Sequence, residues 1–217
     1  DPLHGADFLW QLYARARPGY TGKVTVPVLW DRETGTIVSN ESAEIIRMMN
    51  TAFDHLGAAP GDFYPAALRA EIDAVNAPVY DEVNNGVYKA GFATTQDAYE
   101  AAATPLFARL DALDSRLTDA DWLVGGVLTE ADIRLFTTLV RFDAVYHGHF
   151  KCNKRRIQDF PALERHLERL LTLPEVAATV HLDHIRTHYY ASHRDLNPHG
   201  IVPIGPDLPW SGLVKGA

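Results

Sequence analysis

The sequence has 217 residues, 47% of them hydrophobic and 22% charged, which is typical of a folded protein with a sizeable core. Its 28 acidic and 20 basic side chains give a formal net charge of -8, which excludes a broad electrostatic attraction to nucleic acid or anionic lipid. No apolar run approaches the roughly 18 residues that a membrane span needs.

Residues 1–54 predict mixed α/β structure. Apolar side chains in residues 7–13 recur at helical spacing. Residues 24–30 are β-branched and aromatic apart from a proline, and with the short strand 36–38 they predict a hairpin. A capped amphipathic helix is expected over residues 41–54. This order is typical of the second half of a thioredoxin-like domain, and the first half is not in the sequence.

The remainder predicts a linker, a helical domain and a tail. Residues 55–65 are rich in Gly, Ala and Pro and are expected to form a linker. Residues 66–190 carry apolar side chains at helical spacing, most clearly over 96–117. Residues 191–217 hold too many prolines for regular structure. The predicted fold class is therefore α/β plus all-α, with a helical domain after a partial thioredoxin-like domain.

Helix starts inside the helical domain have recognisable signals. The hydroxyl of Thr129 is expected to accept hydrogen bonds from a first turn, and Asp132 to reach back to the cap. Pro161 and Pro174 are expected in the first turns of two further helices, where a missing N–H is harmless. Pro78 predicts a kink in the first helix of the domain.

Val26 and Pro27 form the first candidate binding feature. A proline within a strand removes a donor and usually marks an edge or a bulge. In thioredoxin-like folds a cis proline at this place exposes the preceding backbone, which then pairs with a peptide-like ligand. A plain strand-edge proline is the alternative interpretation.

Residues 40–42, Asn-Glu-Ser, form the second candidate feature. They open a predicted helix, where free N–H groups and a partial positive charge attract a carboxylate. Glu41 offers a partner for an ammonium group beside it. Together these groups suit the γ-glutamyl end of glutathione, and ordinary helix capping is the alternative.

Several segments taken together resemble one family, the glutathionyl-hydroquinone reductases or Xi-class glutathione transferases, over residues 1–206. The segments are VTVPVLW (24–30), NES (40–42), NGVYKAGFA (85–93), HFKCN (149–153), HYYASH (188–193) and NPHGIVPIGP (197–206). The resemblance implies a glutathione-dependent, cytoplasmic enzyme that reduces glutathionyl-hydroquinones, works without a metal and forms a homodimer through its helical domain.

The resemblance also assigns site residues. The backbone of Val26 beside Pro27 would pair with the cysteinyl part of glutathione, while Glu41 and Ser42 would hold its γ-glutamyl end. Three tyrosines would lie against the quinol ring, which suits a phenol because it combines a hydrogen-bonding hydroxyl with an aromatic face. These tyrosines are Tyr88, Tyr146 and Tyr189. Each could also be an ordinary half-buried core residue.

The nucleophile of the family is the point of departure. It is a cysteine in a Cys-Pro motif that would form a protein–glutathione mixed disulfide. The resemblance places it before residue 1, in a segment that the sequence lacks. Cys152 falls in the HFKCN segment of the helical domain and is expected to be a structural thiol. As the single cysteine it cannot form an intramolecular disulfide, which favours a reducing cytoplasm.

Three alternatives remain open at this point. The chain could be a catalytically inactive glutathione- or partner-binding module of the same architecture. It could be a conjugating transferase, which would need a serine or tyrosine to activate glutathione. Histidines also permit a metal hypothesis, with two candidate groups of ligands. These groups are His147, His149 and Cys152, and His181, His184 and His188.

Overall fold

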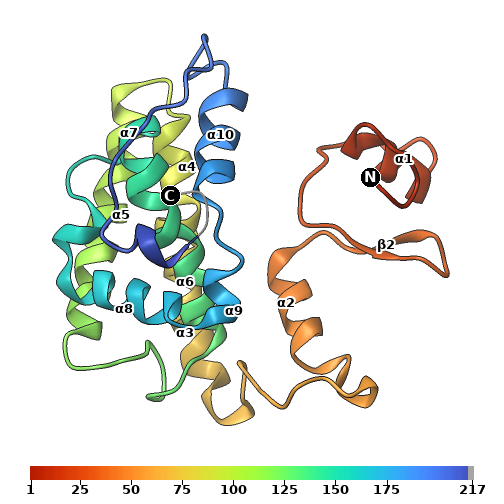
Figure 1. The fold of residues 1–217 in the computed structure, drawn as a ribbon, viewed down its shortest axis with the longest axis horizontal. Helices are drawn as coiled ribbons and strands as arrows, with labels where there is room; N and C mark the ends of the chain where they lie inside the picture. The colour runs from red at the N-terminus through yellow and green to blue at the C-terminus, as the bar shows by residue number, and fades with distance from the viewer. Residues whose placement is uncertain (215–217) are drawn as a thin grey trace. The chain divides into compact units, whose positions relative to one another are not determined.

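The computed structural model describes residues 1–214 and divides the chain into two units, Asp1–Tyr64 and Pro65–Ala217. The first unit holds a short hairpin and two helices (Figure 1). Its elements are α1 (Leu9–Ala16), β1 (Leu29–Asp31), β2 (Thr36–Ser39), α2 (Ser42–Thr51) and the 3₁₀ turn η1 (Asp54–Leu56). The hairpin and the capped helix that follows it agree with the sequence prediction.

The predicted first strand was too long. Residues 24–28 lie outside β1, which pairs with β2 only from Leu29 onward. Pro27 has no N–H to donate. The Thr25 N–H donates to the Tyr13 hydroxyl at 3.2 Å, and the Thr25 carbonyl accepts from it at 2.7 Å. A side chain therefore takes the hydrogen bonds that a neighbouring strand would have made.

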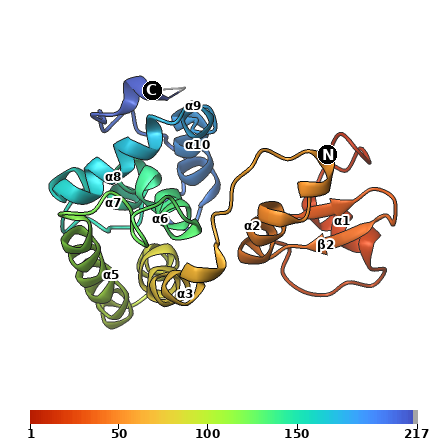
Figure 2. The same ribbon diagram turned by 90° about the horizontal axis from the view of Figure 1, so that it is seen from below.

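The second unit is a bundle of helices (Figure 1). The long helix α5 packs on α4 and α8, α6 packs on α3 and α8, and α10 packs on η4. Figure 2 shows α5 at one edge of this bundle. The elements of this unit are η2 (Ala66–Leu68), α3 (Arg69–Pro78), η3 (Val79–Asn84), α4 (Gly86–Gly91), α5 (Gln96–Leu117), α6 (Glu130–Arg141), η4 (Phe142–Tyr146), α7 (His147–His149), η5 (Ile157–Asp159), α8 (Pro161–Leu171), α9 (Pro174–Ala177), α10 (Leu182–Ser192) and η6 (Ser211–Leu213).

Several predicted details of the helical unit are confirmed. Helix α5 has the expected bounds, and its buried side chains include Leu106, Leu110 and Leu117. The cap of α6 forms as predicted, because the Thr129 hydroxyl accepts from the Ala131 N–H at 3.3 Å and the Asp132 carboxylate accepts from the Thr129 N–H at 2.9 Å. Pro161 and Pro174 open α8 and α9.

Two π-helical segments, η3 and η4, interrupt the helices of this unit. Pro78 ends α3, and the chain continues through η3 into α4, so the expected kink is a change of helix type. The η4 segment likewise joins α6 to α7. Such segments rotate the following residues relative to a regular helix and are frequent at functional sites. Nothing in the hydrophobic pattern indicated them.

No helix among the described residues has both the length and the apolar character needed to cross a membrane.

Candidate functional site

The start of α2 is the first of the two site regions. Glu41 caps the helix, since its Oε1 accepts from the Ala43 N–H at 3.3 Å. The Glu41 N–H itself donates to the Ser39 hydroxyl at 3.0 Å. Glu41 and Ser42 are both exposed, so solutes can reach the helix N-terminus and the carboxylate together. These groups could receive an α-carboxylate and an ammonium group.

The segment before β1 carries the other residues predicted for this region. The Val26–Pro27 peptide bond is cis, and Val26 is 76% exposed. Within residues 1–214, neither backbone polar group of Val26 has a hydrogen-bond partner. An extended peptide-like ligand could therefore pair with this backbone as an added strand would.

A side-chain network joins these two segments. Asn40, directly before Glu41, donates from Nδ2 to the Tyr13 hydroxyl at 3.0 Å and to Thr25 Oγ1 at 2.9 Å. Thr25, directly before Val26, is held through its backbone by the same Tyr13 hydroxyl. Sequence reasoning missed Tyr13, which looked like one more apolar position of a helix.

The helical unit brings the three predicted tyrosines together. Tyr88 lies in α4, Tyr146 ends η4, and Tyr189 lies in α10. Their hydroxyl oxygens are 2.5 Å apart for Tyr88 and Tyr189, 2.8 Å for Tyr146 and Tyr189, and 3.4 Å for Tyr88 and Tyr146. Tyr146 and Tyr189 are buried, whereas Tyr88 is 38% exposed. The three hydroxyls thus form one polar cluster with an exposed member.

Burial decides the protonation of this cluster. It raises the pKa of Tyr146, and Tyr189 and Tyr88 raise that pKa further. Burial also raises the pKa of Tyr189, which Tyr88 raises further and the hydrogen bond with Tyr146 partly lowers. Both phenols are therefore protonated at neutral pH. A protonated phenol donates a hydrogen bond or a proton to an oxygen or carbon that gains negative charge.

Phe150 is the aromatic centre beneath the tyrosines, and sequence reasoning missed it as well. Its fully buried ring stacks on Tyr146 with a centroid distance of 5.5 Å and an angle of 14°. The centroid of its ring is also 5.3 Å from that of Tyr88 and 5.9 Å from that of Tyr189. Its position directly after α7 follows from η4, which could not be foreseen from the sequence.

Gly91→Ala is expected to lower the free energy of unfolding by about 1–3 kcal/mol, as overpacked cores do. A Cβ at Gly91 would stand closer than 3.0 Å to the Phe150 ring. Gly86→Ala is the matched control, because a Cβ there would meet Leu106 at an ordinary 3.7 Å. Urea unfolding followed by circular dichroism measures both; equal stability of the two variants would contradict the close packing.

A histidine pair lies beside Phe150. His149 Nε2 is 3.1 Å from His193 Nδ1. Both rings stack on Phe150, with centroid distances of 5.3 Å for His149 and 5.7 Å for His193. Burial, with smaller effects of His193 and Lys151, lowers the pKa of His149 to about 4, and burial also lowers the pKa of His193. The pair is therefore neutral at pH 7 and shares one N–H.

Because of this pair, the free energy of unfolding is expected to fall in mild acid. His149 takes up a proton near its ordinary pKa of 6.5 in the unfolded chain, but only near pH 4 in the folded protein. Between these values the unfolded chain binds more protons, so the free energy of unfolding increases as the pH rises. The free energy of unfolding should therefore be lower at pH 5 than at pH 7.5. His149→Gln should reduce this difference, whereas exposed His184→Gln should leave it unchanged; equal pH dependence in all three proteins would contradict the assignment.

Cys152 is a structural thiol, as expected. Its side chain is fully buried, and burial raises its pKa to about 12. A thiol in that state is neither ionised nor accessible, so it offers no nucleophile.

The two histidine groups do not assemble into metal sites. Among residues 1–214 no set of three or more His, Cys, Asp or Glu side chains is placed to hold a metal ion. His149 faces His193, and His181 stacks on His184 at 5.0 Å.

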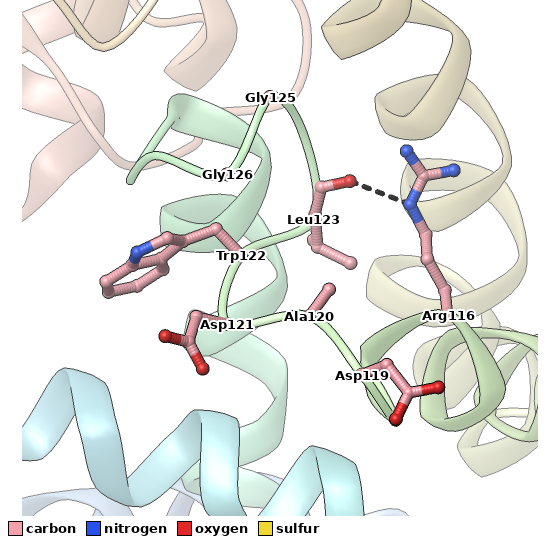
Figure 3. A pocket seen from close by; sticks show the side chains of 8 residues that line it. All are labelled: Arg116, Asp119, Ala120, Asp121, Trp122, Leu123, Gly125 and Gly126. Atoms are coloured by element: carbon pink, nitrogen blue, oxygen red, sulfur yellow. Dashed lines mark hydrogen bonds between the residues drawn. The ribbon is translucent and has the colours of Figure 1, made fainter.

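A surface pocket of about 580 Å³ lies at the end of α5 and in the loop that follows (Figure 3). Arg116 lies on one side and donates from Nε to the carbonyl of Leu123 at 2.7 Å. Trp122, Asp121 and Asp119 are also at its lining, and none of the three tyrosines is. The Arg116 hydrogen bond ties this loop to α5, and the pocket is not part of the tyrosine cluster.

Comparisons with known proteins give one consistent family. Residues 96–169 match the family model described as "Glutathione S-transferase, C-terminal domain". The glutathionyl-hydroquinone reductase PcpF of Sphingobium chlorophenolicum is 59% identical over 99% of this chain and 68% of its own length. The glutathionyl-hydroquinone reductase YqjG of Escherichia coli is 58% identical over 98% of this chain and 64% of its own length.

Solved structures agree with these matches. The glutathione-bound structure of Escherichia coli YqjG superimposes with a TM-score of 0.95 at 57% identity, over 97% of this chain and 68% of that one. The Xi glutathione transferase of Phanerochaete chrysosporium gives a TM-score of 0.92 at 58% identity, over 95% of this chain and 71% of that one.

The chain spans roughly two thirds of the length of these relatives, 68% and 64% for the two reductases. These matches do not bear out the expectation that a cysteine-bearing segment precedes residue 1. They do bear out the fold class, a glutathione-transferase architecture. The chain therefore belongs to the family of the glutathionyl-hydroquinone reductases, the Xi class of glutathione transferases.

Proposed function

We propose that this protein reduces glutathionyl-hydroquinones with glutathione as co-substrate, releasing hydroquinone and glutathione disulfide. The observation that carries the proposal is the convergence of three phenol hydroxyls within 3.4 Å of one another, with Tyr88 exposed. Relatives that are 58% and 59% identical are named for this reaction, and one of them has a structure with glutathione bound.

Each unit offers chemistry for one half of such a conjugate. In the first unit, the helix start at Ser42 suits the α-carboxylate of glutathione, Glu41 its ammonium group, and the Val26 backbone beside Pro27 its cysteinyl peptide. In the second unit, the three tyrosines suit the hydroquinone ring and its oxygens. No metal is needed for either role.

The reaction breaks the bond between the ring carbon and sulfur. A cysteine thiolate of the protein attacks the sulfur of the conjugate and forms a protein–glutathione mixed disulfide, from which a second glutathione releases glutathione disulfide. The electrons of the broken carbon–sulfur bond stay on the ring. The ring carbon must then take up a proton, and a protonated tyrosine of the cluster supplies it. Cys152 is unsuited as the attacking thiol because it is buried and its pKa is raised.

The test is to incubate the protein with a glutathionyl-hydroquinone and reduced glutathione and to separate the products by liquid chromatography. Hydroquinone and glutathione disulfide are expected in equal amounts, at a rate proportional to protein. Binding of the conjugate without turnover would favour the inactive binding module. Formation of new conjugates from quinone and glutathione would favour a conjugating transferase.

We further propose a cytoplasmic homodimer. Glutathione is abundant in a reducing cytoplasm, and a single buried cysteine suits that compartment. Light scattering after gel filtration tests the dimer, and a mass near 24.1 kDa for this chain would contradict it.

A further inference from the structure

We propose that Tyr13 is a positioning residue for glutathione, whose hydroxyl fixes the Val26 backbone relative to the start of α2. The inference rests on the proposed function, because it concerns the same glutathione-binding residues. Tyr13 is 4% exposed and is therefore not placed to touch a ligand itself. Its effect on binding has to pass through the residues that it holds.

The hydrogen bonds of this hydroxyl are complete. A phenol has one donor and two acceptor positions. The Tyr13 O–H donates to the Thr25 carbonyl at 2.7 Å, and its oxygen accepts from the Thr25 N–H at 3.2 Å and from Asn40 Nδ2 at 3.0 Å. The second N–H of the Asn40 amide goes to Thr25 Oγ1 at 2.9 Å. The phenol therefore uses its donor and both acceptor positions, and Thr25 Oγ1 lies a further 3.4 Å from its oxygen.

The two residues that Tyr13 holds are direct neighbours of the predicted ligand contacts. Thr25 precedes Val26, whose backbone has no hydrogen-bond partner within residues 1–214, and Asn40 precedes Glu41. Thr25 and Asn40 are 15 positions apart in the chain, and this network joins them. A peptide-like ligand that pairs with Val26 and reaches the helix start needs a fixed distance between these groups, which is the distance that the phenol sets.

Tyr13→Phe removes the hydroxyl and keeps the ring. Thr25 then loses partners for both backbone groups, and Asn40 loses one acceptor, so both segments can move. The dissociation constant for a glutathione analogue is expected to rise about tenfold, the change that corresponds to losing one to two hydrogen bonds of ordinary strength. Tyr20→Phe is the matched control, because the Tyr20 hydroxyl donates only to the Lys23 carbonyl at 2.7 Å, in the same unit.

The experiment is isothermal titration calorimetry of the whole protein with S-methylglutathione, which has no free thiol. The expected result is a tenfold higher dissociation constant for Tyr13→Phe with unchanged stoichiometry, and wild-type values for Tyr20→Phe. A merely structural role would instead lower the stoichiometry, because misfolded molecules do not bind, and would leave the dissociation constant unchanged. That result, or wild-type binding by Tyr13→Phe, would overturn the inference.

A second variant keeps the test decisive if Tyr13→Phe does not fold. Asn40→Ala removes the hydrogen bonds from Asn40 to the Tyr13 hydroxyl and to Thr25 Oγ1. It should also raise the dissociation constant with unchanged stoichiometry. Wild-type affinity in Asn40→Ala would then overturn the inference. Failure of the wild-type protein to bind S-methylglutathione is a different outcome: it removes the proposed function, and the inference falls with it.

Discussion

Tyr189→Phe is expected to lower kcat/KM for a glutathionyl-hydroquinone by about 100-fold, the lower range for loss of a general acid. The Tyr189 hydroxyl is the only one of the three that lies within 2.8 Å of both others, since Tyr88 and Tyr146 are 3.4 Å apart. Burial raises its pKa, so it carries a proton at neutral pH. Its removal takes away the group best placed to protonate the ring carbon.

Tyr190→Phe is the matched control for this prediction. Tyr190 is the next residue of α10, is half-buried, and faces His149 at a centroid distance of 4.6 Å instead of the cluster. Its variant should keep the wild-type kcat/KM within about twofold, a difference of a few tenths of a kcal/mol. Turnover by Tyr189→Phe at the wild-type rate would show that Tyr189 is not the proton donor.

Asp132→Ala is expected to have the largest effect on stability, a loss of about 3–5 kcal/mol in the free energy of unfolding. Asp132 is fully buried, and its carboxylate accepts from the Leu123 N–H at 2.8 Å and from the Thr129 N–H at 2.9 Å. His166 Nε2 lies 3.5 Å away, and burial lowers the His166 pKa. The substitution removes the acceptor of the buried Leu123 N–H, Thr129 N–H and Thr129 hydroxyl, and each unpaired buried donor is costly.

Asp119→Ala serves as the control, because Asp119 is exposed and lies in the loop that leads to the same region. Its free energy of unfolding should stay within about 0.5 kcal/mol of wild type. Urea unfolding followed by circular dichroism gives both values. A loss below about 1 kcal/mol in Asp132→Ala would mean that the buried cap is not a main support of the fold.

Local signals in the sequence predict some of this structure well. Helix α5 keeps its predicted bounds because its capping Thr95 and the spacing of its leucines depend only on nearby residues. The cap at Thr129 and Asp132 forms for the same reason. The strand expected over residues 24–30 was mostly wrong. A strand forms only where a neighbouring strand pairs with it, and the backbone of Thr25 bonds to the Tyr13 hydroxyl instead.

The site illustrates the same difference between local and distant information. No spacing rule relates Tyr88 to Tyr146 or Tyr189, which are 58 and 101 positions further along. Their meeting depends on two π-helical segments that no periodicity indicated, so resemblance to a family was the only route to them. The role of Tyr13 could not be predicted, because its ring fits a helical apolar pattern and its hydroxyl bonds to Thr25 and Asn40, which are distant in the sequence.

The most direct test of the tyrosine cluster as the quinol site is ¹⁹F NMR of protein labelled with fluorotyrosine, recorded while hydroquinone is added. The chain has nine tyrosines, and single Tyr→Phe variants assign their signals. The signals of Tyr88, Tyr146 and Tyr189 should shift together and saturate, while that of Tyr190 stays in place. Signals of the three tyrosines that do not move at saturating hydroquinone would contradict the assignment of this cluster as the site for the quinol ring.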